Sequence, residues 1–345
     1  MAWTQPEYSK SQVTQAGRTF VDVDATPEDR ALARAIVNNW RSSHAYPLNS
    51  VQLTLRKRAR TVEAEPLVAQ RTKRLPSIRT KLERFSSMEL ARMQDIAGCR
   101  AVLDSVQNVR SVEALYLASR NRRNQSIGRH DDYIAAPKPD GYRGIHVVVK
   151  YAGRQQKAWD GLKVEVQIRS RLMHSWATAL ETVDTFTRQQ LKTGKGTPDW
   201  KRFFTLMSSE IAALEKCPLV PGTPESSTER RQELKQQALD LQVIDRLESY
   251  TQMLSVVSDV RRSKSRWFLL RLDLSKKELF LTPYDSPAQA EEAYGQLEAT
   301  EDVSGNDDQD VVLVAVSSVD ALERAYPNYF LDTRVFVDLV RAAIA

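Results

Sequence analysis

The sequence predicts an α/β protein in which a core of alternating strands and helices is preceded by helices and followed by a small α+β segment. Two β-rich runs with alternating apolar side chains, Ile145 to Tyr151 and Leu162 to Ile168, predict two strands. A strand from Gly98 to Leu103 and a helix from Val106 to Leu117 supply the α/β alternation. After residue 264 the order becomes ββαβα, which is typical of a small sheet packed on helices.

Helices are expected at the start of the chain. Thr26-Pro27-Glu28-Asp29 offers a hydroxyl cap, proline at the first helical position and acids in the first turn, so a helix should run to about Ser43. A second helix is expected after Pro47, and Pro66 should end it.

The core elements follow. Leu67 to Arg71 is expected to be a strand, and Ser77 is expected to cap a short helix through Leu82. After the strands described above, helices are expected from about Ser170 to Thr187 and from Trp200 to Leu214.

The rest of the chain changes character. Pro218 to Thr228 is rich in Pro, Ser and Thr and is interpreted as a linker, followed by a helical segment from about Glu229 to Val260. Trp267 to Leu274 and Leu279 to Tyr284 predict a hairpin. The expected remainder is a helix from Ser286 to about Leu297, an acidic loop over Glu301 to Asp310, a strand over Val311 to Val316 and a helix over Val335 to Ile344.

Composition and charge narrow the class of protein. The 345 residues are 41% apolar and 27% charged, as in ordinary globular proteins. No apolar run reaches the ~20 residues of a membrane span, and the N-terminus lacks a signal-peptide core, so neither membrane nor export is expected. Cys99 and Cys217 are the only cysteines, which excludes a disulfide framework and favours a cytoplasmic location.

The charge is unevenly distributed. Residues 264–345 contain eight Lys/Arg and fifteen Asp/Glu, a net charge of −7, so residues 1–263 carry +13 of the total of +6. A basic front suits phosphates or nucleic acid, and an acidic tail could dock on it; chance unevenness between domains is the alternative.

One loop is rich in groups that suit a nucleotide. Between Asp131 and His146, two prolines and two glycines hold a backbone path that presents Lys138, His146 and the aromatic Tyr142. A ring can stack on a base and cations can bind phosphates. A plain turn between two strands accounts for these residues equally well.

Two carboxylates fall at strands. Asp95 precedes the strand that starts near Gly98, and Glu165 lies inside the strand of Leu162 to Ile168, where an unpaired carboxylate is costly. By alternation, Glu165 should share one face with Gln167 and Arg169. Because Mg²⁺ accepts one or two carboxylates plus substrate phosphates, Asp95 and Glu165 are candidate magnesium ligands. The alternative is a solvated sheet edge.

Five motifs in this order and spacing resemble the RelA/SpoT synthetase domain over about Leu67 to Val183. They are Arg71-Thr72-Lys73, Ser77-Ile78 with Lys81, Asp95-Ile96-Ala97-Gly98-Cys99-Arg100, the loop from Asp132-Tyr133-Ile134 through Pro137-Lys138 and Gly141-Tyr142 to His146, and Glu165-Val166-Gln167-Ile168-Arg169. The resemblance implies a nucleotidyltransferase-like mixed sheet with flanking helices, and an ATP pyrophosphokinase that moves the β,γ-pyrophosphate of ATP onto a ribose hydroxyl.

The resemblance also implies residue roles. Glu165 and Asp95 would be catalytic and hold Mg²⁺, with Glu165 activating the attacking hydroxyl, and Tyr142 would stack on the acceptor base. The implied ATP- and phosphate-binding residues are Arg71, Lys73, Lys81, Arg100, Lys138 and His146. The chain departs from the family pattern at Gly144, Val147 and Ser170, which touch the acceptor side.

The acceptor has two enzymatic interpretations. In one, the 3′ end of tRNA is modified and translation stops, for which basic clusters at Arg56 to Arg60 and at Arg122 and Arg123 would bind RNA phosphates. In the other, a small alarmone synthetase makes (p)ppGpp from ATP and GDP or GTP. The non-enzymatic alternative is an inactive regulatory module, against which Asp95 and Glu165 argue. No DNA partner is expected.

The tail resembles the pseudo-zinc-finger antitoxin region of fused RelA/SpoT toxin–antitoxin proteins of phage defence, CapRel-like proteins among them. The segment from Tyr326 to Thr333 carries this resemblance, together with Asn38 to His44 near the start. It implies a tail that blocks the ATP site until a phage protein relieves it, with Tyr326 and Tyr329 as the entering groups. A dimerisation or stability module is the alternative.

Four parts are therefore expected. Residues 1–65 form an N-terminal helical segment, 66–216 the synthetase domain, 217–263 a linker with connecting helices, and 264–345 an acidic regulatory domain. An additional metal-dependent HD hydrolase domain is not expected, because about 65 residues precede the synthetase motifs and the chain has four histidines.

Overall fold

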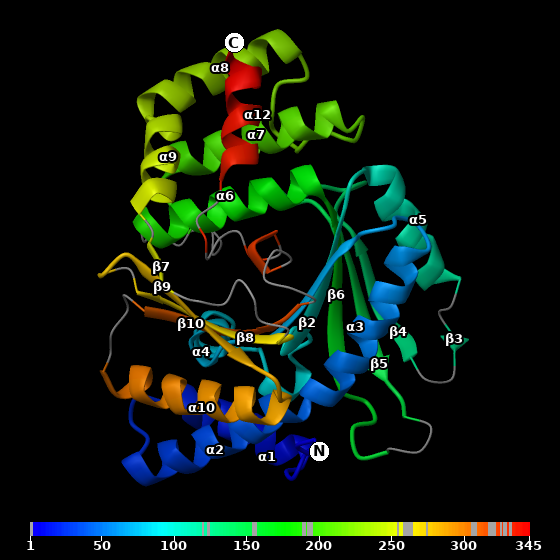
Figure 1. Ribbon diagram of the computed structural model, residues 1–345, viewed down its shortest axis with the longest axis vertical. Coiled ribbons are helices and arrows are strands. Elements are labelled where there is room, and N and C mark those ends of the chain that lie inside the picture. The colour runs from blue at the N-terminus through cyan, green and yellow to red at the C-terminus, as the bar shows by residue number, and fades with distance from the viewer. Residues whose placement is uncertain are drawn as a thin grey trace.

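A ten-stranded mixed sheet organises the computed structural model (Figure 1). The structure describes residues 3–118, 121–122, 125–153, 157–187, 191, 196–253, 255–257, 265–273, 275–304, 309–316, 322–324, 326, 330 and 333–345. The strands lie in the order β3-β4-β5-β6-β2-β1-β10-β8-β9-β7. β2 with β6 and β7 with β9 are parallel, and the other pairs are antiparallel.

The structure confirms most of the strands that the sequence predicted. Their bounds are β1 Leu67–Thr72, β2 Ala97–Leu103, β3 Asn121–Arg122, β4 Gln125–Asp132, β5 Ile145–Tyr151, β6 Lys163–Ser170, β7 Ser255–Val257, β8 Trp267–Asp273, β9 Glu278–Tyr284 and β10 Gln309–Ala315. β4 was not predicted, because polar residues fill it: it lies toward one margin of the sheet, paired with β5 and the short β3.

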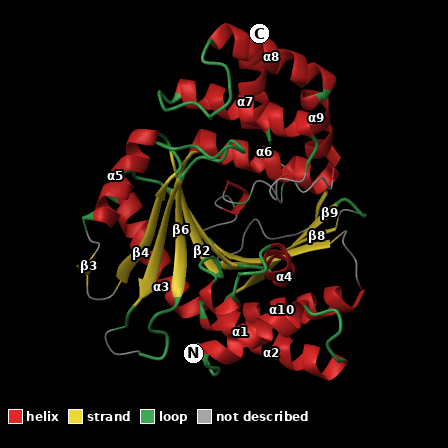
Figure 2. Cartoon of the chain, turned by 180° about the vertical axis from the view of Figure 1, so that it is seen from behind, coloured by secondary structure: helices red, strands yellow, loops and turns green. Residues whose placement is uncertain are grey.

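The helices frame the sheet on several sides (Figure 2). Their bounds are α1 Lys10–Val21, α2 Pro27–Ser43, α3 Ala45–Arg60, α4 Leu75–Arg84, the 3-10 turn η1 Leu90–Arg92, α5 Val106–Leu117, α6 Arg171–Thr187, α7 Pro198–Leu214, α8 Ser227–Asp240, α9 Val243–Met253, α10 Pro287–Ser304 and α12 Arg334–Ile344. None of the helices in the described part of the chain is long and apolar enough to cross a bilayer.

Helix α2 confirms the N-terminal prediction, with the Thr26 side chain accepting a hydrogen bond from the Asp29 amide. Helix α1 was missed, although Ser9 and Gln12 form a capping box and Val13, Ala16 and Phe20 make a buried stripe. The Ser-x-x-Gln spacing was the signal that could have located it.

The predicted cap of α4 was wrong. The helix begins at Leu75 after Arg74, ahead of Ser77. Pro76 falls in the first helical turn, where a missing amide N–H costs no hydrogen bond, so the helix can start before the serine.

Three further segments differ from expectation. α10 continues through Glu301 to Ser304, where an acidic loop was expected, because no Gly or Pro follows Gly295 before Gly305 and Glu and Ala favour helix. Ser255–Val257 is strand β7 inside the segment expected to be helical, since its β-branched residues pair with β9. Helix α3 ends at Arg60, well before Pro66.

One face of the core half of the sheet is covered by helices, and the other carries the polar side chains of β6. Helices α3 and α5 pack on the sheet, and Val164, Val166 and Ile168 of β6 point into the core that they form. The intervening residues of β6, Glu165 and Gln167, therefore face the opposite side, as the alternation predicted.

The C-terminal strands extend the same sheet. β10 pairs with β1, with Gln70 opposite Ala315 and Arg71 opposite Val314. α10 covers one face of this extension, and α12 packs among α6, α7, α8 and α9 (Figure 1). The described elements of residues 265–345 are thus divided between the sheet with α10 on its face and the helical cluster that α12 joins.

Candidate active site

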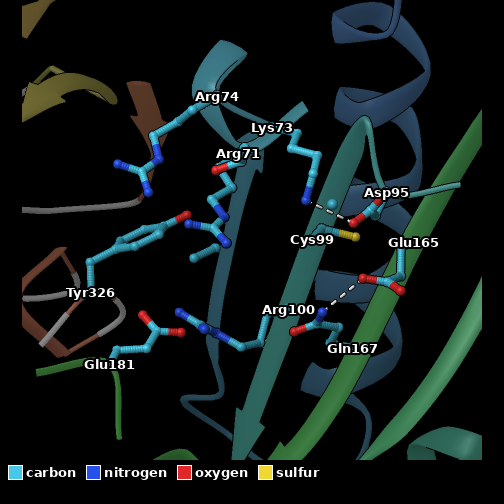
Figure 3. Close-up of a pocket in the computed structure, with 13 residues that line it drawn as sticks. Arg71, Lys73, Arg74, Asp95, Cys99, Arg100, Glu165, Gln167, Glu181 and Tyr326 are labelled. Atoms are coloured by element: carbon cyan, nitrogen blue, oxygen red, sulfur yellow. Dashed lines mark hydrogen bonds and ion pairs between the residues drawn. The ribbon is translucent and has the colours of Figure 1, made fainter. Parts of the chain in front are cut away.

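A polar pocket opens where β1, β2 and β6 lie side by side (Figure 3). Its volume is about 110 Å³, below the ~300–1,000 Å³ of typical ligand pockets. The lining residues are Ala69, Arg71, Lys73, Arg74, Ser77, Asp95, Gly98, Cys99, Arg100, Glu165, Gln167, Glu181 and Tyr326. Six of the residues predicted from the sequence therefore line one cavity: Arg71, Lys73, Asp95, Arg100, Glu165 and Tyr326.

Asp95 is held between two lysines. Its carboxylate accepts hydrogen bonds from Lys73 Nζ at 3.0 Å and Lys81 Nζ at 2.8 Å. Burial alone would raise the pKa of Asp95, but the charges and hydrogen bonds of the two lysines outweigh burial and bring the pKa to about 2. Asp95 is therefore ionised at neutral pH. Burial also lowers the pKa of Lys73, and the charge of Asp95 opposes that shift.

Glu165 sits in a row of polar groups along β6. Its Oε2 accepts a hydrogen bond from Gln167 Nε2 at 2.7 Å, and its Oε1 lies 3.1 Å from His146 Nδ1. Burial would raise the pKa of Glu165, but the hydrogen bond and charge of His146 bring it below the ordinary value. The charge of Asp95 raises the same pKa, so the two carboxylates are close enough to repel each other.

The row continues to Tyr142, whose hydroxyl lies 2.5 Å from His146 Nε2 and accepts a hydrogen bond from Arg169 at 2.8 Å. Burial raises the pKa of Tyr142, and Arg169 opposes that shift. The Lys138 ammonium lies 5.0 Å from the centre of the Tyr142 ring. Lys138, Tyr142, His146 and Glu165 thus form one continuous cluster.

Gly144 is needed for this arrangement. Its φ of +151° favours glycine, and a Cβ added there would lie 3.2 Å from Arg169 Cγ and 3.4 Å from the Tyr142 hydroxyl. The glycine that departs from the family pattern at this position therefore leaves room for the close approach of Arg169.

Tyr326 closes the opposite side of the pocket. Only 4% of the residue is exposed, and its hydroxyl donates a hydrogen bond to the Gln70 carbonyl at 2.9 Å. The Arg100 guanidinium lies 5.5 Å from the ring centre. Burial raises the pKa of Tyr326 to about 12 and lowers that of Arg100 to about 10. Figure 3 shows the ring beside Arg71 and across the cavity from Asp95.

The remaining candidates lie elsewhere. Lys81 reaches Asp95 from α4 without lining the pocket. Arg122 belongs to β3 at the margin of the sheet, far along the strand order from β1. Arg123 and Tyr329 lie outside the described residues.

Sequence reasoning missed Glu181 as a site residue. It comes from α6, and its place at the pocket depends on how that helix packs against the sheet. Nothing in the local sequence distinguishes this glutamate from a solvated helical one. Gln167 was placed on the correct face but was given no role.

Asp95 and Glu165 are the residues of this pocket that could hold a magnesium ion together with substrate phosphates. Among the described residues no group of three or more His, Cys, Asp or Glu could hold a metal ion. Asp95 and Glu165 are two ionised carboxylates on one cavity wall. Mg²⁺ commonly uses one or two carboxylates and takes its other ligands from water and substrate phosphates, so this pair suffices only together with a phosphate ligand.

Comparison with known proteins supports the motif assignment. Residues 70–184 match the family model described as a region found in RelA/SpoT proteins. The chain is 36% identical over 113 residues to the GTP pyrophosphokinase YjbM of Bacillus subtilis, covering 32% of this chain and 52% of YjbM. It is 30% identical over 86 residues to the GTP pyrophosphokinase YwaC of the same organism, covering 25% and 40%. The chain thus spans about half or less of these relatives.

Among solved structures, the small alarmone synthetase 1 of Bacillus subtilis bound to its product pppGpp is similar, with a TM-score of 0.42 and 28% identity. The match covers 50% of this chain and 89% of that one. The end of strand β1 with Arg71, the strands β2 and β6, and the loop of Tyr142 fall within residues 70–184. Asp95 and Glu165 both lie within the residues that match this family model.

Proposed function

We propose that this chain transfers the β,γ-pyrophosphate of ATP to a ribose hydroxyl of a guanine nucleotide, GDP or GTP. The observation that carries the proposal is the meeting of two ionised carboxylates, Asp95 and Glu165, with Arg71, Lys73 and Arg100 around one pocket. The matched relatives are named GTP pyrophosphokinases, and one solved relative is bound to pppGpp, which supports the guanine acceptor.

The proposed chemistry is a single displacement at phosphorus. The ribose hydroxyl oxygen forms a bond to the β-phosphorus of ATP, the bond from that phosphorus to the α-phosphate oxygen breaks, and AMP leaves. Glu165 accepts the hydroxyl proton. Its lowered pKa keeps it in the basic form at neutral pH, and His146 and Gln167 fix its orientation.

The cationic wall provides the ATP-binding side. Lys73 and Lys81 stand beside Asp95, where they would neutralise the triphosphate. Arg71 and Arg100 offer planar guanidinium groups on which adenine can stack. Tyr142, with Lys138 beside its ring, provides the corresponding surface for the acceptor base.

Magnesium is part of the proposal. Asp95 and Glu165 would hold the ion, and when bound it supplies charge neutralisation for the transferred group. Without such a cation, the two carboxylates repel each other, as the effect of Asp95 on the Glu165 pKa indicates.

We also propose tRNA as a second acceptor, because basic residues lie at the surface away from the pocket. Arg56, Lys57 and Arg60 follow one another along α3, and the charges of Arg60 and Arg266 add to burial in lowering the pKa of Arg56. Such clusters bind RNA phosphates without reading sequence, as binding of a tRNA acceptor would require. The relatives' names favour guanine nucleotides, so tRNA is the secondary acceptor.

The proposal includes autoinhibition by the tail. The supporting observation is the buried Tyr326 ring, which forms part of the pocket wall near Arg71 and Arg100, in a cavity smaller than a nucleotide pocket. An aromatic ring there competes with adenine for the guanidinium faces. A toxin–antitoxin role with a phage protein as trigger follows only from the resemblance of the tail.

The decisive experiment supplies ATP labelled in the β- or γ-phosphate to the full chain with Mg²⁺ and, in separate reactions, GDP, GTP or deacylated tRNA. Label in guanosine tetra- or pentaphosphate supports the main proposal, and label at the tRNA 3′ end supports the secondary one. A variant without the Tyr326 ring is assayed in parallel, so that autoinhibition is not mistaken for inactivity. Transfer to none of the acceptors by either protein would refute pyrophosphokinase activity.

A further inference from the structure

A second cavity lies beside the catalytic strand and is not used by the proposed reaction. It has a volume of about 500 Å³, within the range of ligand pockets. Helices α1 and α2, the η1 turn and the start of β6 form it, and it shares no lining residue with the candidate ATP pocket. Its lining residues are Lys10, Ser11, Thr14, Gln15, Arg18, Trp40, His44, Glu89, Ala91, Arg92, Met93, Gly161, Leu162 and Lys163.

The charge of this groove is strongly positive. Four cationic side chains face one carboxylate, that of Glu89. Arg18 and Arg92 approach Glu89 only at 3.6 and 3.8 Å, and both are well exposed. Such long surface ion pairs contribute little. The cations therefore keep most of their capacity to bind an added anion.

Lys163 is the centre of this cluster. Burial and the charges of Lys10, Arg92 and Lys150 all lower the pKa of Lys163. Lys163 thus lies among other cations, of which Lys10 and Arg92 also line the groove, and Glu89 is the one carboxylate among the described residues of that lining. Like charges gathered in this way destabilise a protein unless an anion offsets them.

A second, independent feature is an unused hydrogen-bond donor in the wall. Trp40 is 5% exposed, and its indole N–H is buried with no acceptor among the described residues. The neighbouring His44 ring bonds the Trp40 carbonyl at 2.7 Å, and burial lowers the pKa of His44 to about 4, so this histidine is neutral at physiological pH. Buried donors normally have an acceptor, so this N–H is an unsatisfied polar group in a residue of the groove wall.

We propose that this groove binds the phosphate chain of a small polyphosphate, either free or attached to a nucleoside, through Lys10, Arg92 and Lys163. Ser11 and Thr14 add hydroxyl donors at the wall. A chain of two or three phosphates matches several cations spread over a ligand-sized cavity better than a single carboxylate would. Lys163 and Glu165 project from one face of β6, about 6.6 Å apart along the strand, so the ligand would bind next to the catalytic row.

Binding is tested apart from catalysis. The full chain carrying Lys73→Met, which weakens the ATP pocket, is titrated by calorimetry with inorganic tripolyphosphate. Adding Lys163→Met and Arg92→Met should raise the dissociation constant at least tenfold. A matched control, Lys235→Met with Arg246→Met, removes the same charge from exposed positions on α8 and α9 and should change it less than twofold.

Folding is checked in the same proteins. Removal of two mutually repelling cations should leave the melting temperature unchanged or slightly higher, and tripolyphosphate should raise the melting temperature of the Lys73→Met protein but not of the groove variant. Titration of the Lys73→Met protein and of its groove variant with GTP identifies the source of the phosphates, because only the affinity lost on the groove substitutions belongs to the groove and not to the proposed acceptor site. A loss at least tenfold larger than with tripolyphosphate assigns the groove to a nucleotide, and an equal loss assigns it to the phosphate chain alone. No binding in the Lys73→Met background, or equal binding after the groove substitutions, would overturn the proposal.

Discussion

Replacement of Glu165 by Gln is the sharpest test of the catalytic row. The change removes the negative charge and the proton-accepting group while hardly altering volume. The amide oxygen can still accept the hydrogen bond from Gln167, and the amide nitrogen can donate to His146 Nδ1 in the tautomer that carries its proton on Nε2. The fold should therefore lose no more than about 1 kcal/mol, a fall in melting temperature of a few degrees.

The expected effect on the rate is much larger. Removal of a general base typically costs about 100-fold or more. Initial rates of label transfer from ATP to GDP at pH 7.5 would measure the loss, and Glu83→Gln, at an exposed position of α4, is the matched control. A Glu165→Gln protein that melts as the wild type does and keeps more than a tenth of its turnover would show that the reasoning about this carboxylate is wrong.

Further outcomes follow from other contacts. Tyr326→Ala should raise basal transfer without any trigger, because a closed state favoured by a few kcal/mol opens when a buried ring is lost; an inactive, insoluble protein would instead show that the ring is structural. Glu210→Ala should lower stability by about 3–5 kcal/mol in urea unfolding, since it leaves the buried charge of Arg230 without its carboxylate partner; Glu229→Ala, at an exposed position, should not. The folded pKa of Asp95, about 2, lies below its ordinary value of 3.8, so the stability it contributes is present above about pH 4 and is lost toward pH 2; the difference in unfolding midpoint between wild type and Asp95→Asn should narrow over that interval.

Much of the catalytic face could be predicted because its information is local. Alternation along β6 places Glu165, Gln167 and Arg169 on the face opposite Val164 and Val166, and the structure confirms this row through its hydrogen bonds. Because successive side chains of a strand point to opposite faces, identifying the buried residues of the strand is enough to place the others on the opposite face.

The rest depends on contacts that no short segment encodes. The pairing of β1 with β10 joins residues far apart in the chain, and the hydrophobic pattern of each strand is compatible with several partners. Glu181 reaches the pocket through the packing of α6 on the sheet. The missed helix α1 is a different case, because its capping box was visible in the sequence.

The place of β10 has a consequence for synthesis of the chain. Arg71 pairs with Val314, so β1 lacks this neighbour until residues near 314 have been made. At about 5–20 residues per second, translation from one to the other takes roughly 12–50 s. During that interval β2 can already pair with β1 on its other side, and β6 with β2, while the β1 margin that will meet β10 presents unpaired backbone groups. The strand that carries Arg71 is thus exposed to incorrect pairing on the ribosome longer than any other strand of the core.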